Sequence, residues 1–178
     1  MKRPPLTEMS RPLQVDRIAP GGSSETLSAT PAECRLLEKR FGLSALHHLD
    51  AVIDLSRWRG NGVKAVGTVS AGIEQVCVVS LEPFTSEMRE PIERYFLPRS
   101  AAPPTLEQSI EQADVDVFDH GIIDLGEMVC EIVALALDPY PRRPGIAFDG
   151  PGEGDAAEGI EAPVSPFAAL KALGKRRT

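Results

Sequence analysis

The alternation of apolar and polar residues between 51 and 81 is the clearest pattern in the chain. In 63–81 the odd positions are mostly apolar and the even positions mostly polar, which is typical of a strand with one buried face. The same alternation runs through 51–55, and Gly60-Asn61-Gly62 favours a tight turn between the two runs, because such residues adopt positive φ at little cost. We therefore predict a long hairpin, whose second strand bends at Ala71-Gly72 because so long a strand does not stay flat.

Two helices are predicted from their end signals and their apolar periodicity. The first begins at Thr30, an N-cap whose capping-box partner is Glu33, and ends at Gly42. The second begins at Asp124, with Glu127 three residues later as its capping-box partner. Apolar residues cover most of the second helix, so we expect it to be packed over most of its circumference.

Three shorter segments complete the predicted fold. Residues 10–18 read as a first strand, with 25–29 as its partner. Residues 85–97 also fit a helical period, but Pro91 disfavours a helix interior and favours an edge strand. We predict an α+β domain: an antiparallel, strongly bent, barrel-like sheet with two main helices packed on it.

Composition divides the chain into segments. Sixteen prolines and fifteen glycines favour strands, turns and loops over a helical bundle. We predict a disordered N-terminus at 1–9 and a single α+β domain at 10–148, with a polar linker at 98–118. A glycine-rich, disordered acidic linker follows at 149–163, and a short amphipathic segment with a basic end at 164–178.

The net charge of -7 is unevenly distributed. Residues 1–99 hold 13 Lys and Arg against 12 Asp and Glu, whereas 100–178 hold 6 against 14. The acidic half should repel phosphate, so a nucleic-acid contact is expected from the first half or from the terminal Lys175-Arg176-Arg177. No apolar run is long enough for a membrane span, no secretory signal is visible, and an odd number of cysteines indicates a reducing cytoplasm.

The best candidate for RNA contact is the predicted hairpin turn. Arg57, Trp58 and Arg59 combine a stacking surface with two cations, as single-strand binders do, and Lys64 follows on the next strand. The alternative is a solvated sheet face with a partly buried tryptophan.

The cysteines do not have the spacing of a metal site. Cys34, Cys77 and Cys130 fall in separate elements, whereas a structural zinc needs about four ligands around one tetrahedron. Cys77 has valine neighbours on the apolar face of its predicted strand, so we interpret it as a small buried hydrophobe. We predict no metal and no cofactor.

Acidic and histidine side chains near the second helix are weak catalytic candidates. Asp119, His120 and Asp124 suggest acid–base work, but Asp124 is better explained as a helix cap. Glu127 and Glu131 share a helix face, which is typical of a solvated stripe. We predict no catalytic residue and no small-molecule substrate, with a metal-dependent hydrolase built on Glu127, Glu131 and His120 as an alternative.

Three stretches in order, CVVSLEPF, IDLGEMVCEIVALALDPYP and PFAALKAL, resemble the YceD family of large ribosomal RNA subunit accumulation proteins. The likeness runs from about Ser10 to Lys175 and is closest to an alphaproteobacterial form. Relatives carry C-x-x-C where this chain has Cys77-Val78-Val79-Ser80. We expect the motif residues to be structural; they are Cys77, Leu81, Glu82, Phe84, Asp124, Leu125, Glu127, Pro166 and Phe167.

The resemblance implies a non-enzymatic, cytoplasmic ribosome-biogenesis factor that supports accumulation or processing of large-subunit (23S) ribosomal RNA. Two mechanisms remain open: the first half contacts ribosomal RNA, or acidic segments at 100–120 and 149–163 hold a basic ribosomal protein or processing factor. The charge of -7 favours the second, adaptor mechanism. A purely structural protein-interaction domain is a further alternative.

Overall fold

The computed structural model describes residues 7–101 and 115–146. The elements, in chain order, are β1 (Pro12–Gln14), η1 (Val15–Arg17), β2 (Ser23–Ser28), α1 (Pro31–Phe41), β3 (Ala45–Trp58), β4 (Gly62–Val76), β5 (Pro83–Pro98), η2 (Arg99–Ala101), β6 (Val115–Phe118), β7 (Ile122–Asp124) and α2 (Leu125–Ala136). All of them belong to one compact unit, Met1–Ile146.

The main sheet has five strands in the order β2-β3-β4-β5-β6, and β1 pairs separately with β7. The pairs from β2 to β5 are antiparallel, but β6 runs parallel to β5. The predicted α+β class is therefore correct, whereas the predicted all-antiparallel, barrel-like sheet is not what the structure has. The long connection after β5 permits the parallel return of β6, and the sheet stays open because β2 and β6 form its two edges.

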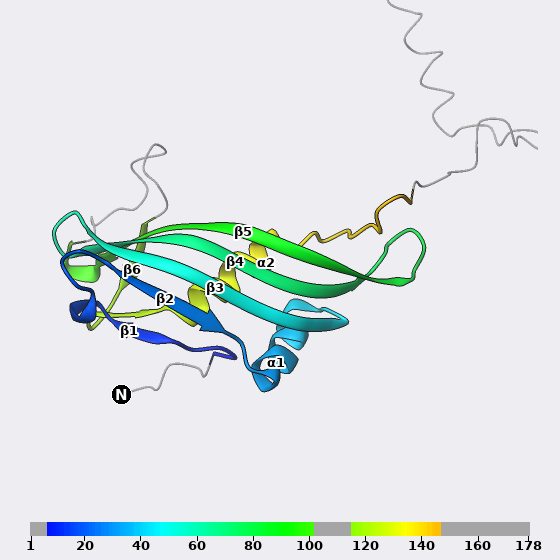
Figure 1. The fold of residues 1–178 in the computed structure, drawn as a ribbon, viewed down its shortest axis with the longest axis horizontal. Helices are drawn as coiled ribbons and strands as arrows, with labels where there is room; N and C mark the ends of the chain where they lie inside the picture. The colour runs from blue at the N-terminus through cyan, green and yellow to red at the C-terminus, as the bar shows by residue number, and fades with distance from the viewer. Residues whose placement is uncertain (1–6, 102–114, 147–178) are drawn as a thin grey trace, which may run out of the picture. The chain divides into compact units, whose positions relative to one another are not determined.

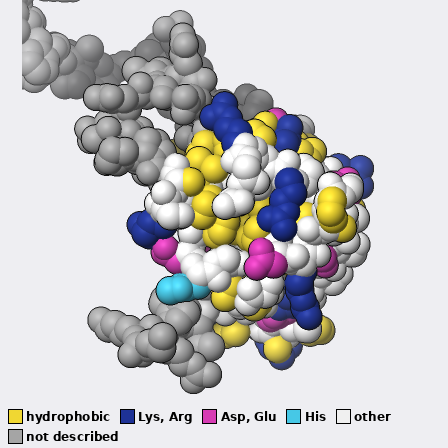
Figure 2. All heavy atoms as spheres, turned by 90° about the vertical axis from the view of Figure 1, so that its left-hand side faces the viewer, with side chains coloured by type: hydrophobic (Ala, Val, Ile, Leu, Met, Phe, Trp, Pro, Cys, Tyr) yellow, Lys and Arg dark blue, Asp and Glu magenta, His cyan; other side chains and the backbone are white. Residues whose placement is uncertain are grey.

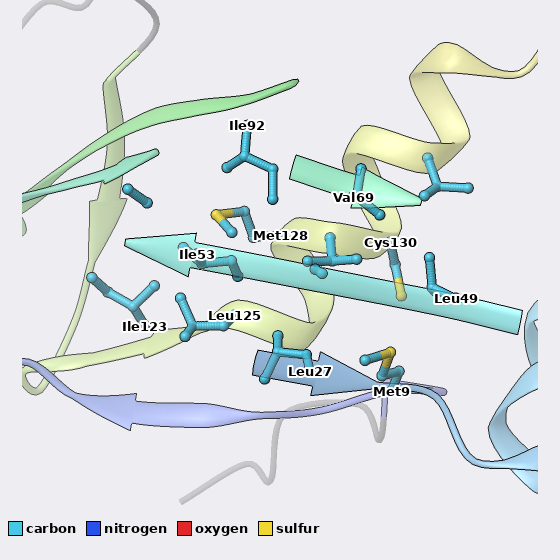
Figure 3. Close-up of a cluster of buried hydrophobic side chains, with 14 of the residues drawn as sticks. Met9, Leu27, Leu49, Ile53, Val69, Ile92, Ile123, Leu125, Met128 and Cys130 are labelled. Carbon is cyan, nitrogen blue, oxygen red and sulfur yellow. The ribbon is translucent and has the colours of Figure 1, made fainter. Parts of the chain in front are cut away.

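One face of this sheet carries the hydrophobic core. Odd-numbered residues of β3 and β4, such as Ile53 and Val69, are buried there, as the alternation predicts. Helix α2 lies behind the strands in Figure 1 and brings Met128 and Cys130 against them (Figure 3). Each aliphatic side chain so buried stabilises the fold by roughly 1.5–3 kcal/mol relative to exposure.

The long hairpin is present but ends earlier than predicted. Strand β4 stops at Val76, and the residues after it form a turn. Near the predicted bend, the register slips between Leu46 and His48 of β3, opposite Ile73 and Gly72. The irregularity therefore lies on the partner strand, where an extra residue bends the strand and increases the local twist.

Helix α1 matches its predicted ends closely. The Thr30 hydroxyl accepts the Glu33 backbone N–H, the Glu33 carboxylate accepts the Thr30 N–H, and Gly42 adopts φ 68°. In α2 the Asp124 carboxylate caps as predicted, accepting the N–H groups of Gly126 and Glu127. The predicted reciprocal half of that capping box is wrong, because the Glu127 carboxylate pairs with Arg40 of α1 instead.

Several predicted strand pairings are wrong. The segment at 25–29 does not pair with the first strand: β1 pairs with β7, and β2 pairs with β3. Residues Pro83–Pro98 do form a strand, and Pro91 lies in the part of it that has β4 as its only neighbour in the structure as described. The range 98–118, predicted as a linker, ends in β6.

Within the described part of the chain, no helix is both long and apolar enough to cross a membrane. The predicted segments at 1–9, 149–163 and 164–178 lie wholly or largely outside the described residues.

Candidate functional site

The β3–β4 turn brings two aromatic rings and two cations together. Trp58 ends β3, and the chain reverses through Arg59 and Gly60, which both have positive φ. Lys64 on β4 lies directly opposite Tyr95 on β5. We call Trp58, Arg59, Lys64 and Tyr95 the hairpin-tip cluster.

The geometry of the hairpin-tip cluster is that of stacked cation–π contacts. The rings of Trp58 and Tyr95 lie 4.7 Å apart between centroids, tilted by 50°. The guanidinium carbon of Arg59 lies 4.6 Å from the centroid of Trp58, and Nζ of Lys64 lies 5.2 Å from that of Tyr95. Each of the two rings therefore has one cation over it within about 6 Å, which is the range of a cation–π attraction.

Lys64 is held in its charged form by its neighbours. Hydrogen bonds with Tyr95 and with Glu93 raise the pKa of the Lys64 ammonium. The Glu93 carboxylate lies 3.2 Å from Nζ, so it partly neutralises this cation. Arg59, in contrast, has no ion pair among the residues described, which leaves its charge available to an incoming anion.

The structure separates Arg57 from the other predicted RNA-contact residues. Trp58 and Lys64 sit at even positions on the uncovered sheet face, whereas Arg57 points to the opposite side. Its Nη2 donates to the Ile18 carbonyl oxygen at 3.5 Å. Sequence reasoning missed Tyr95, because its place in the cluster depends on the β4–β5 register and on no local motif. Figure 2 shows the end of the molecule at which the β3–β4 turn lies, and Lys and Arg side chains surround hydrophobic surface there.

Cys77 lies in the turn that follows β4. Its side chain is 0% exposed, as predicted. It lies outside the main hydrophobic cluster, however, and the prediction that it sits within a strand is wrong. Its Sγ accepts the backbone N–H of Ser80 at 3.5 Å and that of Arg143 at 3.3 Å. The Ser80 hydroxyl contributes most, and together with these N–H groups it lowers the pKa of the thiol to about 6.

The Cys77 turn does not supply the ligands of a zinc site. Ser80 occupies the position of a second sulfur and instead donates its N–H to Cys77. Across residues 7–101 and 115–146, no group of three or more His, Cys, Asp or Glu residues is placed to hold a metal ion. All three cysteines are free and buried.

The other motif residues differ in their surroundings. Leu81 is 77% exposed and has a positive φ of 59°, which is unfavourable for a leucine. The Glu82 carboxylate pairs with Arg143 at 3.0 Å, and Phe84 is half-buried. Leu125 is buried in the core. Pro166 and Phe167 lie outside the described residues.

The weak catalytic candidates are engaged in structural contacts. Arg99 binds both carboxylate oxygens of Asp119, at 2.7 and 2.8 Å. The Asp124 carboxylate accepts a hydrogen bond from the Ser10 hydroxyl in addition to its capping bonds. The Glu127 carboxylate accepts hydrogen bonds from both Nη1 and Nη2 of Arg40. These three carboxylates therefore connect segments that are distant in sequence. Glu131 is exposed on α2.

Comparison with known proteins agrees with the resemblance in the sequence. The family model described as large ribosomal RNA subunit accumulation protein YceD matches residues 65–174. No curated protein and no solved structure matches the chain. The matched range includes the Cys77 turn and α2, whereas Trp58, Arg59 and Lys64 precede it. Because the match covers more than half of the chain, the protein belongs to the YceD family.

Proposed function

We propose that the protein is a non-enzymatic, cytoplasmic ribosome-biogenesis factor that supports accumulation of large-subunit ribosomal RNA by contacting unpaired RNA at the hairpin-tip cluster. Membership of the YceD family supports the ribosomal role. The contact with RNA is argued from this chain's own residues.

The observation that carries the proposal is the ring pair with a cation on each face. Unpaired bases stack on aromatic side chains, while nearby cations bind the phosphates. Binding of this kind does not depend on the base sequence of the RNA. Trp58 and Tyr95 provide adjacent stacking surfaces, 4.7 Å apart. Arg59 can move from the ring to a phosphate at small cost, because a solvent-exposed cation–π contact contributes only about 0.5–1 kcal/mol.

The test uses a fluorescent group that the protein already has. Trp58 is the only tryptophan, so stacking of oligouridine on it should quench its emission. Arg59→Ala should weaken binding. Arg59→Ala with Lys64→Ala should also reduce the slope of log affinity against log salt by about 1.4, or about 0.7 for each phosphate that is no longer neutralised.

The matched control is Arg57→Ala. It removes the same charge two residues away in sequence, but Arg57 points to the other side of the sheet. If Arg57→Ala and Arg59→Ala weaken oligouridine equally, only net charge matters and the proposed site is wrong. Absence of quenching at low salt would also contradict it.

A second candidate mechanism, the adaptor, is supported by the charge distribution. Residues 100–178 carry 14 acidic against 6 basic side chains, so long-range attraction would favour a cationic protein. Most of the segments that would make this contact, 102–114 and 149–163, lie outside the described residues. Deletion of 149–163 should weaken capture of basic ribosomal proteins, and equal recovery at equal salt would count against this mechanism.

A further inference from the structure

Among residues 7–101 and 115–146, no helix lies on the face of the main sheet opposite α2 (Figure 1). Antiparallel sheets often leave one face in water, but such faces are usually polar throughout. Here the side chains in the middle of the face are short and partly apolar. Those of Val52 and Val66 are 50% and 41% exposed. Thr68 and Pro91 lie in the same cross-strand row as Val52. The result is a surface of short side chains, which lose little entropy when they are covered.

Charges around this apolar centre are mostly negative. The even positions of β3 and β4 and the odd positions of β5 share the uncovered face. Its acidic residues are Asp50, Asp54, Glu74, Glu87 and Glu93, and its basic residues are Lys64 and Arg89. An apolar centre with a charged rim is the arrangement of many protein interfaces, and the negative excess selects a cationic partner.

Asp54 stands out within the rim. The Glu93 carboxylate has Lys64 as a neighbour and that of Glu87 lies 3.4 Å from Nε2 of His48, whereas the Asp54 carboxylate has no hydrogen bond or ion pair with any described residue. It lines a hollow of about 410 Å³ together with Ser24, Ser56 and Val66. The hollow combines an unpaired carboxylate, two hydroxyls and an aliphatic wall, which suits the stem and head of a Lys or Arg side chain.

We propose that this uncovered face is a docking surface for a cationic segment of another protein. A Lys or Arg of that segment enters the hollow at Asp54, and its apolar side chains cover Val52 and Val66. RNA is disfavoured on the part of the face around Asp54 and Val52, because the acidic rim there repels phosphate. This part lies on the same face as the hairpin-tip cluster but farther from the turn, and docking there does not depend on RNA contact at the tip.

The test measures binding of a short labelled peptide in which Lys-Arg pairs alternate with single valines. Asp54→Asn should weaken binding by about five- to tenfold at low salt, since it removes one charge-assisted hydrogen bond. The matched control is Glu25→Gln, because Glu25 is partly exposed on the strand next to Asp54 but at a position of the covered face. Equal weakening in both variants would mean that the peptide senses net charge only, and the proposal would be wrong.

The apolar part of the surface needs its own pair of variants. Val52→Asn should weaken the peptide, whereas Leu135→Asn should not, although Leu135 is 80% exposed on α2. Circular dichroism melts establish that each variant is folded. Unchanged affinity for Val52→Asn and Asp54→Asn would overturn the proposal.

Discussion

At the scale of single residues, two buried cysteines show how hydrogen bonding decides the chemistry of one side chain. Burial raises the pKa of Cys130 to about 12, because a thiolate there would be poorly solvated. The Cys77 thiol is also covered, but N–H groups and a hydroxyl point at its sulfur and lower its pKa to about 6. The interpretation as a small hydrophobe therefore fits Cys130 and is incomplete for Cys77.

This difference predicts a pH-dependent contribution of Cys77 to stability. Its folded pKa of about 6 lies below the ordinary value of 9.0, so the thiolate stabilises the fold fully above pH 9. The contribution declines as pH falls and is lost near pH 6. The free energy of unfolding of the native chain, minus that of Cys77→Ala, should therefore grow from pH 6 to pH 9 in urea titrations.

Cys130→Ala is the control for the Cys77 measurement. Its thiol stays protonated across this range, since its pKa is about 12. The variant should be less stable than the native chain by a similar amount at pH 6 and at pH 8, because only packing is removed. A flat difference for Cys77→Ala as well would mean that Cys77 is not a thiolate near neutral pH.

At the scale of elements, the start of α1 is fixed by a contact with a segment more than one element away in sequence. Its capping glutamate, Glu33, also receives both Nη groups of Arg11, at 2.7 and 2.9 Å. The Arg11 guanidinium and the Thr30 N–H lower the pKa of Glu33 to about 2. One carboxylate thus joins the helix start to the strand β1 that follows Arg11.

We predict that Glu33→Gln lowers the free energy of unfolding by about 1–2 kcal/mol at pH 7. Because the folded pKa is lowered, this stabilisation is present above pH 4.5 and is lost as pH falls toward 2. Urea titrations at pH 7 and pH 3 should show the variant converging on the native chain. In a double-mutant cycle with Arg11→Met the two destabilisations should not add, and full additivity would mean that the pair contributes nothing.

Elements whose ends depend on local chemistry could be predicted, and pairings between distant segments could not. Thr30, Glu33 and Gly42 specify α1 within a dozen residues. The pairing of β1 with β7 joins Leu13 to Ile123, and no local pattern encodes it. The same limit applies to the candidate site: the sequence places Trp58 and Arg59 beside a turn, but only the β4–β5 register brings Tyr95 to Lys64.

At the scale of the whole molecule, opposite charges occupy different parts of the described fold. Arg59 is available for phosphate at the hairpin tip, whereas Asp54 and its acidic neighbours lie farther from the turn on the uncovered sheet face. A net charge of -7 therefore does not exclude local RNA contact. The two proposals together require such a distribution, with RNA held at the hairpin tip and a cationic protein held on the middle of the sheet.

A chain truncated after Ile146 separates the two acidic surfaces proposed for a cationic partner. Every described residue of the hydrophobic core lies before this point, so the truncated chain should unfold cooperatively at nearly the thermal midpoint of the full chain. It lacks 149–163 but keeps Asp54 and Val52.

If the sheet face is the docking surface, the truncated chain should bind the Lys-Arg-Val peptide almost as well as the full chain, and Asp54→Asn should still weaken it. If the later acidic segment holds the peptide instead, truncation alone should abolish binding, while Asp54→Asn in the full chain should have no effect. Both measurements belong below about 0.15 M salt, since charges more than about 8 Å apart are screened above it.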